Sequence, residues 1–248
     1  MNQLTTDKRT RVIAALVEGA SINSIVRMTG VSKVTILRLL EQMGCACAEY
    51  HNQVVRNIKT RRVQCDEIWA FVYAKQKNVT EEQMAKGAGD CWTWTAIDAD
   101  TKLIISYALG DRGIKTAHFF MQDLASRISN RFQLTTDGHR VYVDAVEAAF
   151  GADVDYSMLV KIYGMPDNLA ESRYSPATCI GCRTATISGN PDPKHISRAT
   201  LNGRTSQCAW GCAVLHVLRT DSAKRLRITV MPWPFTSCTT TFAGYTRP

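Results

Sequence analysis

Two aspartates have the type and placement needed for phosphoryl-transfer chemistry. Asp66 lies inside a stretch rich in β-branched and aromatic residues, and Asp137 directly follows another such stretch. A carboxylate inside a strand is costly to bury unless it is paired or binds a metal ion. Two carboxylates that meet can hold Mg²⁺ ions about 3.5–4 Å apart, which activate an attacking oxygen and stabilise a leaving one. Asp66 and Asp137 are therefore the predicted catalytic residues and metal ligands, although an Asp-Gly pair such as Asp137-Gly138 is also typical of a plain turn.

The elements around these aspartates predict a mixed α/β fold. Strands are expected at 63–73, 92–98 and 103–109, a helix at 116–131, a strand at 132–136, a helix at 141–150 and a strand at 155–162. In this β-β-β-α-β order the first and fourth strands are expected to lie side by side, which would bring Asp66 and Asp137 together. Adjacent side chains on a strand point to opposite faces, so one of Asp66 and Glu67 should face inward. Trp69 is expected in the core, and Phe119, Phe120, Leu124 and Ile128 are expected to point inward from the helix.

The N-terminal residues predict a helix-turn-helix domain over 1–45. A helix is expected over 7–18, and Ser21 and Ser32 can cap a second and a third helix, with a tight turn at Gly30 between them. The apolar residues at helical spacing in these two helices are Ile22, Ile25 and Val26, and Ile36, Leu39, Leu40 and Met43. The third helix would offer hydroxyls and cations to DNA through Ser32, Lys33, Thr35 and Arg38. A plain three-helix bundle without a DNA role is the alternative. Residues 46–62 are expected to form a basic linker, and Cys45 and Cys47 are interpreted as buried thiols at a helix end.

The charge distribution favours a polyanionic partner, and double-stranded DNA fits it. The net charge is +8, with ten Lys/Arg against four Asp/Glu in residues 1–62, 14 against 17 in residues 63–198, and six against one in residues 199–248. A basic head before an acidic middle is typical of a chain that grips a polyanion at its N-terminus. No run of 18 apolar residues and no apolar signal segment occurs, and the nine cysteines are odd in number. These features predict a cytoplasmic protein with reduced thiols and no membrane contact.

Three separated motifs resemble the insertion-sequence-one family of bacterial transposases. They are Cys65-Asp-Glu-Ile-Trp-Ala-Phe-Val72, Thr135-Thr-Asp-Gly-His139 and Ser188-Gly-Asn-Pro-Asp-Pro-Lys-His-Ile-Ser197. The resemblance implies a ribonuclease-H-like catalytic domain, here over 63–198, in which an Asp-Asp-Glu triad with Mg²⁺ cuts and joins DNA. It places Asp66 as the first acid and Asp137 as the second. Transposon ends and target DNA would be the partners, with a possible homodimer.

The third acid of that triad is missing at its expected place. A Tyr-Val-Glu-Arg-Gln-Asn-Leu stretch should follow Ser197, but residues 198–206 differ from it. Reading the codons of residues 199–206 in a frame displaced by one base permits that stretch, because each new codon takes the third base of one codon and the first two of the next. We therefore interpret residues 199–248 as an out-of-frame tail without a stable fold. The catalytic domain is then incomplete and strand transfer is expected to be defective.

Two other functions remain open from the sequence. A truncated transposase that keeps its DNA-binding head could act as a repressor without catalysis. A zinc-binding structural protein is the third reading, through Cys179, Cys182, Cys208 and Cys212, whose paired spacing is that of a zinc knuckle.

Overall fold

The computed structural model describes residues 4–164 and 178–196 of the chain. The expected out-of-frame tail at 199–248 lies outside the described residues, as do Cys208 and Cys212 of the zinc reading. The expectations for these segments therefore stay predictions.

Three helices form the N-terminal unit, and their bounds follow from side-chain caps. They are α1 (Thr6–Val17), α2 (Ile22–Thr29) and α3 (Lys33–Val54). Thr5, Ser21 and Ser32 each accept a hydrogen bond from a backbone N–H in the first turn of the following helix. Gly30 ends α2 with a left-handed φ of 68°, a conformation that glycine adopts without a steric penalty. The apolar faces meet in one small core, formed by Val12, Leu16, Ile22, Ile25, Val31, Ile36, Leu39 and Leu40.

The helix α3 is longer than the sequence pattern indicated. It continues to Val54, so the predicted domain boundary at residue 45 does not coincide with a helix end, and residues 46–54 of the predicted linker are helical. Cys45 and Cys47 consequently lie within the helix. Cys45 is half-buried and Cys47 is exposed, so the interpretation as buried thiols at a helix end is wrong. Gly44 directly follows the apolar stripe, but no proline occurs there and the chain continues in the same helix toward the sheet.

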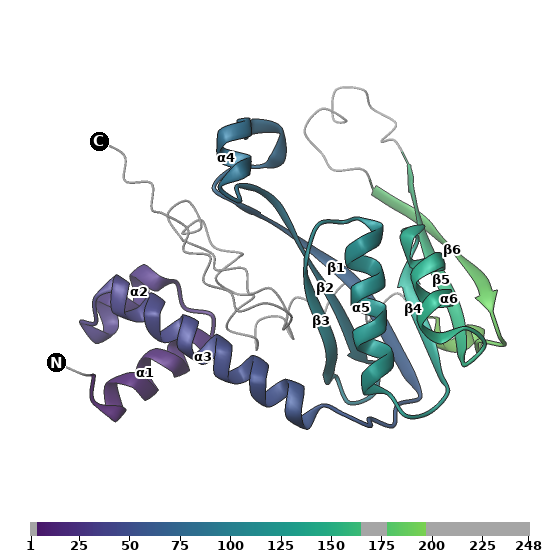
Figure 1. Ribbon diagram of the computed structural model, residues 1–248, viewed down its shortest axis with the longest axis horizontal. Helices are drawn as coiled ribbons and strands as arrows, with labels where there is room; N and C mark the ends of the chain where they lie inside the picture. Colours follow the sequence, from purple (N-terminus) through teal and green to yellow (C-terminus); the bar gives the residue numbers. More distant parts are fainter. Residues whose placement is uncertain (1–3, 165–177, 197–248) are drawn as a thin grey trace.

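A six-stranded mixed sheet forms the rest of the described chain (Figure 1). Its strands are β1 (Arg62–Val72), β2 (Gly89–Asp98), β3 (Ile104–Gly110), β4 (Phe132–Asp137), β5 (Val154–Gly164) and β6 (Thr178–Ser188). Their spatial order is β3-β2-β1-β4-β5-β6. The pairs β1–β4 and β4–β5 are parallel, and the other three pairs are antiparallel. The expected contact between the first and fourth strands is therefore confirmed, whereas β6 was not expected.

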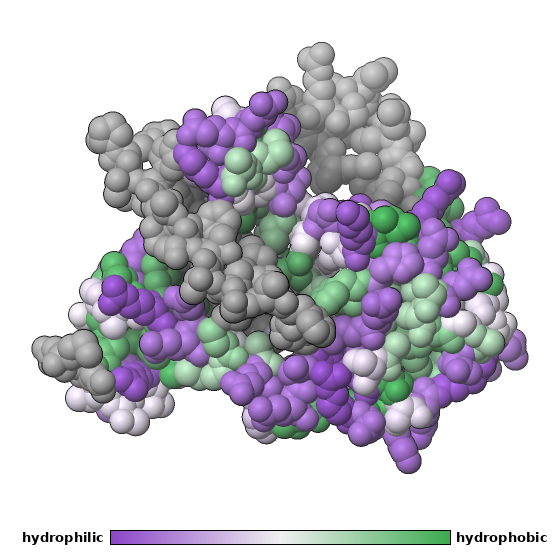
Figure 2. All heavy atoms as spheres, viewed as in Figure 1, coloured by the Kyte–Doolittle hydropathy of each residue, from purple (hydrophilic) through white to green (hydrophobic). Residues whose placement is uncertain are grey.

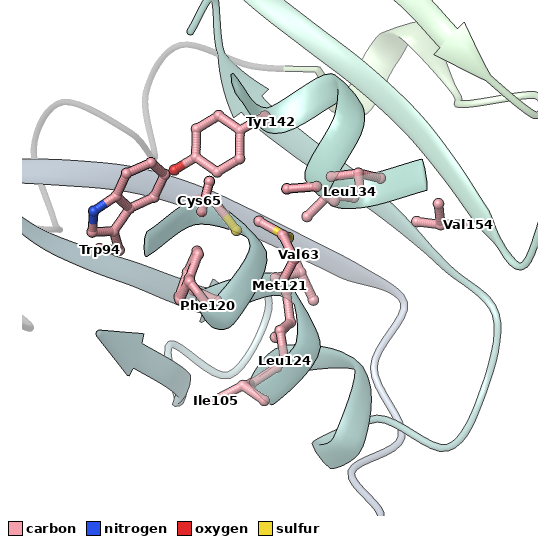
Figure 3. Packing of buried hydrophobic residues seen from close by; sticks show 14 of the residues in the cluster. Val63, Cys65, Trp94, Ile105, Phe120, Met121, Leu124, Leu134, Tyr142 and Val154 are labelled. Carbon is pink, nitrogen blue, oxygen red and sulfur yellow. The ribbon is translucent and has the colours of Figure 1, made fainter. Parts of the chain in front are cut away.

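Two helices, α5 (Ile114–Arg127) and α6 (Val141–Phe150), cover one face of this sheet (Figure 1). Their inward side chains pack with Val63, Cys65 and Trp94 from the central strands, and all three are fully buried (Figure 3). Phe120 and Leu124 point inward as expected, but Phe119 is 41% exposed. The strand side chains on the other face of the sheet are polar and also buried. They include Gln64, Thr93, Thr95, Thr135 and Ser157.

A hairpin between β1 and β2 projects beyond these helices. It carries the short elements η1 (Gln76–Asn78) and α4 (Glu81–Ala85), and its tip is mainly hydrophilic (Figure 2). A further short turn, η2 (Pro193–His195), follows β6. Because β1 extends into this hairpin, Trp69 lies beyond the helical cover and is 40% exposed. The expectation that Trp69 packs in the core is wrong.

Polar contacts fasten the end of α3 to the sheet domain. Arg127 is fully buried, pairs with Asp123 at 2.7 Å, and donates to the Val55 carbonyl at 3.1 Å and to Asn52 Oδ1 at 3.0 Å. The Nε2 atom of His51 lies 2.9 Å from the carbonyl oxygen of Ile104. Since a buried guanidinium must keep its partners, these contacts tie α3 and α5 together.

Candidate functional site

The two predicted acids lie at matching positions of neighbouring parallel strands. The pairing of β1 with β4 sets Arg62, Val63 and Gln64 opposite Gln133, Leu134 and Thr135. Asp66 and Asp137 each lie two residues beyond the last of these pairs. Parallel strands have their carboxyl ends at the same edge, which is where α/β sheets place their sites. The register therefore places Asp66 next to Asp137, at the point where β4 ends while β1 continues to Val72. We name Asp66, Glu67 and Asp137 the acidic edge.

The side chain of Glu67 lies on the face of β1 that α5 and α6 cover. It shares strand parity with Val63 and Cys65, which belong to the core, and its side chain is only 1% exposed. Arg112, in the loop between β3 and α5, contacts Glu67 Oε2 at 3.0 Å and Asp137 Oδ2 at 3.3 Å through one guanidinium nitrogen. Its Nε also donates to Glu67 Oε2 at 3.1 Å. One cation thus holds a glutamate of β1 and the aspartate of β4.

Three acidic side chains influence the pKa of the Cys65 thiol. Burial raises the pKa of Cys65 well above its ordinary value, and the negative charges of Glu67, Asp66 and Asp137 raise it further. Burial also raises the pKa of Glu67, with the nearby Asp137 charge adding to the rise and Tyr142 and Arg112 opposing it. The shared Arg112 guanidinium likewise sets Glu67 and Asp137 close together.

Tyr142 closes the inner end of this neighbourhood. Its ring is fully buried and packs edge-on against Trp94 at 5.2 Å between centroids, next to Cys65 (Figure 3). The Tyr142 hydroxyl and Glu67 Oε1 are both buried, and hydrogen bonding between the two groups opposes the rise in the pKa of Glu67 and adds to the rise in that of Tyr142. The buried Glu67 carboxylate and the Tyr142 hydroxyl are therefore neighbours.

The loop after β4 is held by Asp137 itself. Asp137 Oδ1 accepts a hydrogen bond from the backbone N–H of His139 at 2.9 Å, and His139 Nε2 lies 3.0 Å from the carbonyl oxygen of Arg112. The His139 ring also lies 6.1 Å from that of Trp94. His139 thus links the loops that carry Asp137 and Arg112.

Asp66 precedes Glu67 in β1, so its side chain lies on the opposite face of the strand. It is half-buried, and its Oδ1 accepts a hydrogen bond from the Glu67 backbone N–H at 3.0 Å. No group of three or more His, Cys, Asp or Glu side chains among the described residues is arranged to hold a metal ion. A metal site formed by Asp66 and Asp137 accordingly stays a prediction.

The predicted DNA-contacting residues lie at the start of α3. The hydroxyls of Ser32 and Thr35 contact each other at 2.8 Å, and Ser32 also caps the helix. Lys33 is half-buried and Arg38 is exposed. The hydroxyls are therefore occupied in capping, and Arg38 is the side chain most open to a phosphate. Contact of Ser32, Lys33, Thr35 and Arg38 with DNA stays a prediction, as does the helix-turn-helix interpretation.

Sequence reasoning missed three residues of the acidic edge. Strand alternation left Asp66 and Glu67 as alternatives, and the motif resemblance favoured Asp66. Arg112 lies in the segment Gly110-Asp-Arg-Gly113, whose composition indicates only a loop. Tyr142 begins a helix whose apolar pattern indicates only core packing. Their roles depend on contacts between elements that are far apart in the sequence.

Comparisons with known proteins do not assign a family. No family model matches the chain, and no curated protein matches it. Among solved structures, it is similar to a piggyBac transposase in a synaptic complex with hairpin DNA, at 11% identity and a TM-score of 0.39 over 90% of this chain. The chain spans 59% of the length of that transposase chain. Within the described residues, no helix has the length and apolar character needed to cross a membrane.

Proposed function

We propose that the chain is a transposase-like DNA-processing protein. Its N-terminal helices bind double-stranded DNA, and Asp66 and Asp137 hold Mg²⁺ for cleavage and strand transfer. The order and directions of the six strands are compatible with a ribonuclease-H-like domain. The observation that carries the proposal is the placement of Asp66 and Asp137 at matching positions of adjacent parallel strands.

The residues present fit Mg²⁺ by the chemistry of their donor atoms. Mg²⁺ is a hard cation that proteins bind through one or two carboxylates, with waters and substrate phosphates completing the coordination. Asp66 and Asp137 offer such carboxylates, and the buried carboxylate of Glu67 is an additional pair of oxygens beside Asp137. When bound, the metal would activate the attacking oxygen and stabilise the leaving one.

The remaining residues of the chain have supporting roles in this proposal. Asp137 is fixed by the backbone N–H of His139, which limits the positions its carboxylate can take. Arg112 neutralises the acids while no metal is bound and can contact a DNA phosphate when it leaves them, because its side chain is 40% exposed. Trp94 and Tyr142 pack beneath the acids and exclude water from their inner side.

The proposal is tested by metal binding and strand transfer with the full chain. Isothermal titration with Mn²⁺ should show binding that Asp66→Asn and Asp137→Asn each weaken by about tenfold or more, because each removes a charged ligand. Asp144→Asn is the matched control, since Asp144 is an exposed acid on α6. Mn²⁺ affinity that survives both substitutions would remove the metal site from the proposal. In a strand-transfer assay with transposon-end DNA we expect weak activity that Asp66→Asn and Asp137→Asn abolish.

A repressor-like protein that binds DNA without catalysis is the second candidate. It is favoured by the pairing of Arg112 with both Glu67 and Asp137, and by the lack of a three-residue metal group in the described part of the chain. This candidate predicts a mobility shift with transposon-end DNA that needs no divalent ion. It also predicts no strand transfer at any metal concentration.

A further inference from the structure

An aromatic surface continues from the acidic edge along the same strand. Trp69 and Phe71 follow Glu67 at two-residue intervals, so all three side chains lie on one face of β1. The ring centroids of Trp69 and Phe71 are 5.6 Å apart. Trp69 is 40% exposed, so part of its ring is open at the surface and is not covered by α5 or α6.

The neighbouring strand adds a second indole. Trp92 of β2 is directly opposite Trp69 in the antiparallel pair, so both side chains share a face. Lys75 Nζ lies 5.2 Å from the Trp69 ring centroid, and Arg112 Cζ lies 4.8 Å from that of Trp92. Each indole thus has a cation over its ring, which a stacked base would displace, and Trp92 also packs against the hydrophobic core. We name Trp69, Phe71 and Trp92 the aromatic platform.

We infer that the aromatic platform stacks unpaired bases of a DNA strand, while Lys75 contacts its phosphates. The inference rests on the proposed function only in naming DNA as the strand. Aromatic rings that alternate with cations are the usual means of binding single-stranded nucleic acid, because every base has a face that can stack. Two strand residues span about 6.6–6.8 Å, so a base on Trp69 would keep its backbone near Glu67 and the acidic edge.

The charges decide between this occupant and a protein partner. Lysine is depleted at the centres of protein interfaces, whereas Lys75 lies over the Trp69 ring and gives the platform a positive charge that suits phosphates. Double-stranded DNA is also a poor occupant, because its base faces are already stacked. The aromatic platform therefore binds a DNA strand whose bases are unpaired, whereas the N-terminal helices bind double-stranded DNA.

The test measures the binding of labelled oligothymidylate to the full chain by fluorescence anisotropy in EDTA. Trp69→Leu and Trp92→Leu should each weaken binding by about tenfold, and affinity for duplex DNA should change less than twofold. Phe119→Leu is the matched control, because it removes an exposed ring from the outer face of α5. Unchanged oligothymidylate affinity in the double variant overturns the inference. So does a loss of self-association in sedimentation without a loss of oligothymidylate binding, since a second copy would then be the occupant.

A second measurement does not depend on the variants folding. Ultraviolet cross-linking of the unaltered chain to an oligonucleotide that contains 5-iododeoxyuridine should modify Trp69 or Trp92, and cross-links confined to residues 4–54 contradict the inference. Because the binding assay contains EDTA, its result is separate from the metal site. If the Trp variants lose oligothymidylate while Asp66→Asn and Asp137→Asn keep Mn²⁺ binding, the platform stands and the proposed catalysis fails. The reverse pattern removes the platform alone.

Discussion

Replacing Arg112 with Gln removes the cation that joins Glu67 and Asp137. The side chains of these acids are 1% and 24% exposed, and the guanidinium lies 3.0 and 3.3 Å from them. Hydrogen bonds to charged groups contribute about 1.5–3 kcal/mol, but solvent screens a partner that is 40% exposed. We therefore expect Arg112→Gln to lower the free energy of unfolding by about 1–2 kcal/mol at pH 7 in EDTA. Urea denaturation followed by tryptophan fluorescence measures this loss.

The same substitution should tighten the binding of a divalent ion. Because Arg112 and the metal compete for the carboxylate of Asp137, release of about 1.4 kcal/mol of pairing corresponds to about a tenfold lower Kd for Mn²⁺. At a Mn²⁺ concentration about a hundredfold above Kd, binding adds about 2.7 kcal/mol and should restore the stability lost in EDTA.

Arg131→Gln is the matched control for Arg112→Gln. Arg131 is 49% exposed and pairs with Asp155 at 2.6 Å, away from the acidic edge. This variant should leave the Mn²⁺ Kd unchanged. Equal Mn²⁺ affinity in Arg112→Gln and the unaltered chain would refute the competition, and equal stability in EDTA would show that the pairing is not stabilising.

Three further predictions concern the N-terminal helices, the buried Glu67 and the contact of Arg127 with the end of α3. Lys33→Ala with Arg38→Ala should weaken duplex binding and reduce the slope of log K against log salt by about one or two phosphate equivalents in anisotropy titrations, whereas Lys8→Ala should not. Glu67→Gln should stabilise the protein, relative to the unaltered chain, by an amount that grows as the pH rises above 4.5. Burial raises the folded pKa of Glu67, so its charge lowers stability above the unfolded pKa value and has no cost below it. Parallel urea titrations from pH 4 to 8 measure the difference in the free energy of unfolding, and a difference that does not change with pH contradicts the reasoning. Arg127→Met should lower the free energy of unfolding by about 3–5 kcal/mol, since it leaves Asp123 without its buried partner, and thermal unfolding with an unchanged midpoint would count against this contact.

The sequence determined the local elements of this protein. Side-chain caps at Ser21 and Ser32, a glycine turn at Gly30 and apolar periodicity placed the three N-terminal helices, because these signals act within a few residues. Strand patterning placed β1, β2, β3, β4 and β5 within a few residues of their bounds. The order of elements also predicted that β1 and β4 are neighbours, because one helix connects strands β3 and β4 on the same face.

Only the tertiary structure decided how the acidic edge is arranged. Alternation along β1 shows that Asp66 and Glu67 face opposite ways, but it does not show which face the helices cover. That depends on α5 and α6, which set Glu67 beside Asp137 and bring Arg112 from the far end of β3. Trp69 was expected in the core for the same reason, since its apolar character does not reveal that β1 extends past these helices.

The length of α3 and the contacts at its end show the same limit. The apolar stripe that packs the N-terminal core fades after Met43, so periodicity alone suggests a helix end there. The helix instead continues because its second half has another surface to meet, with His51 reaching Ile104 and Asn52 reaching Arg127. A local pattern records which residues are apolar, whereas burial is set by elements that approach from elsewhere in the chain, and at Glu67, Trp69 and α3 those elements decided the outcome.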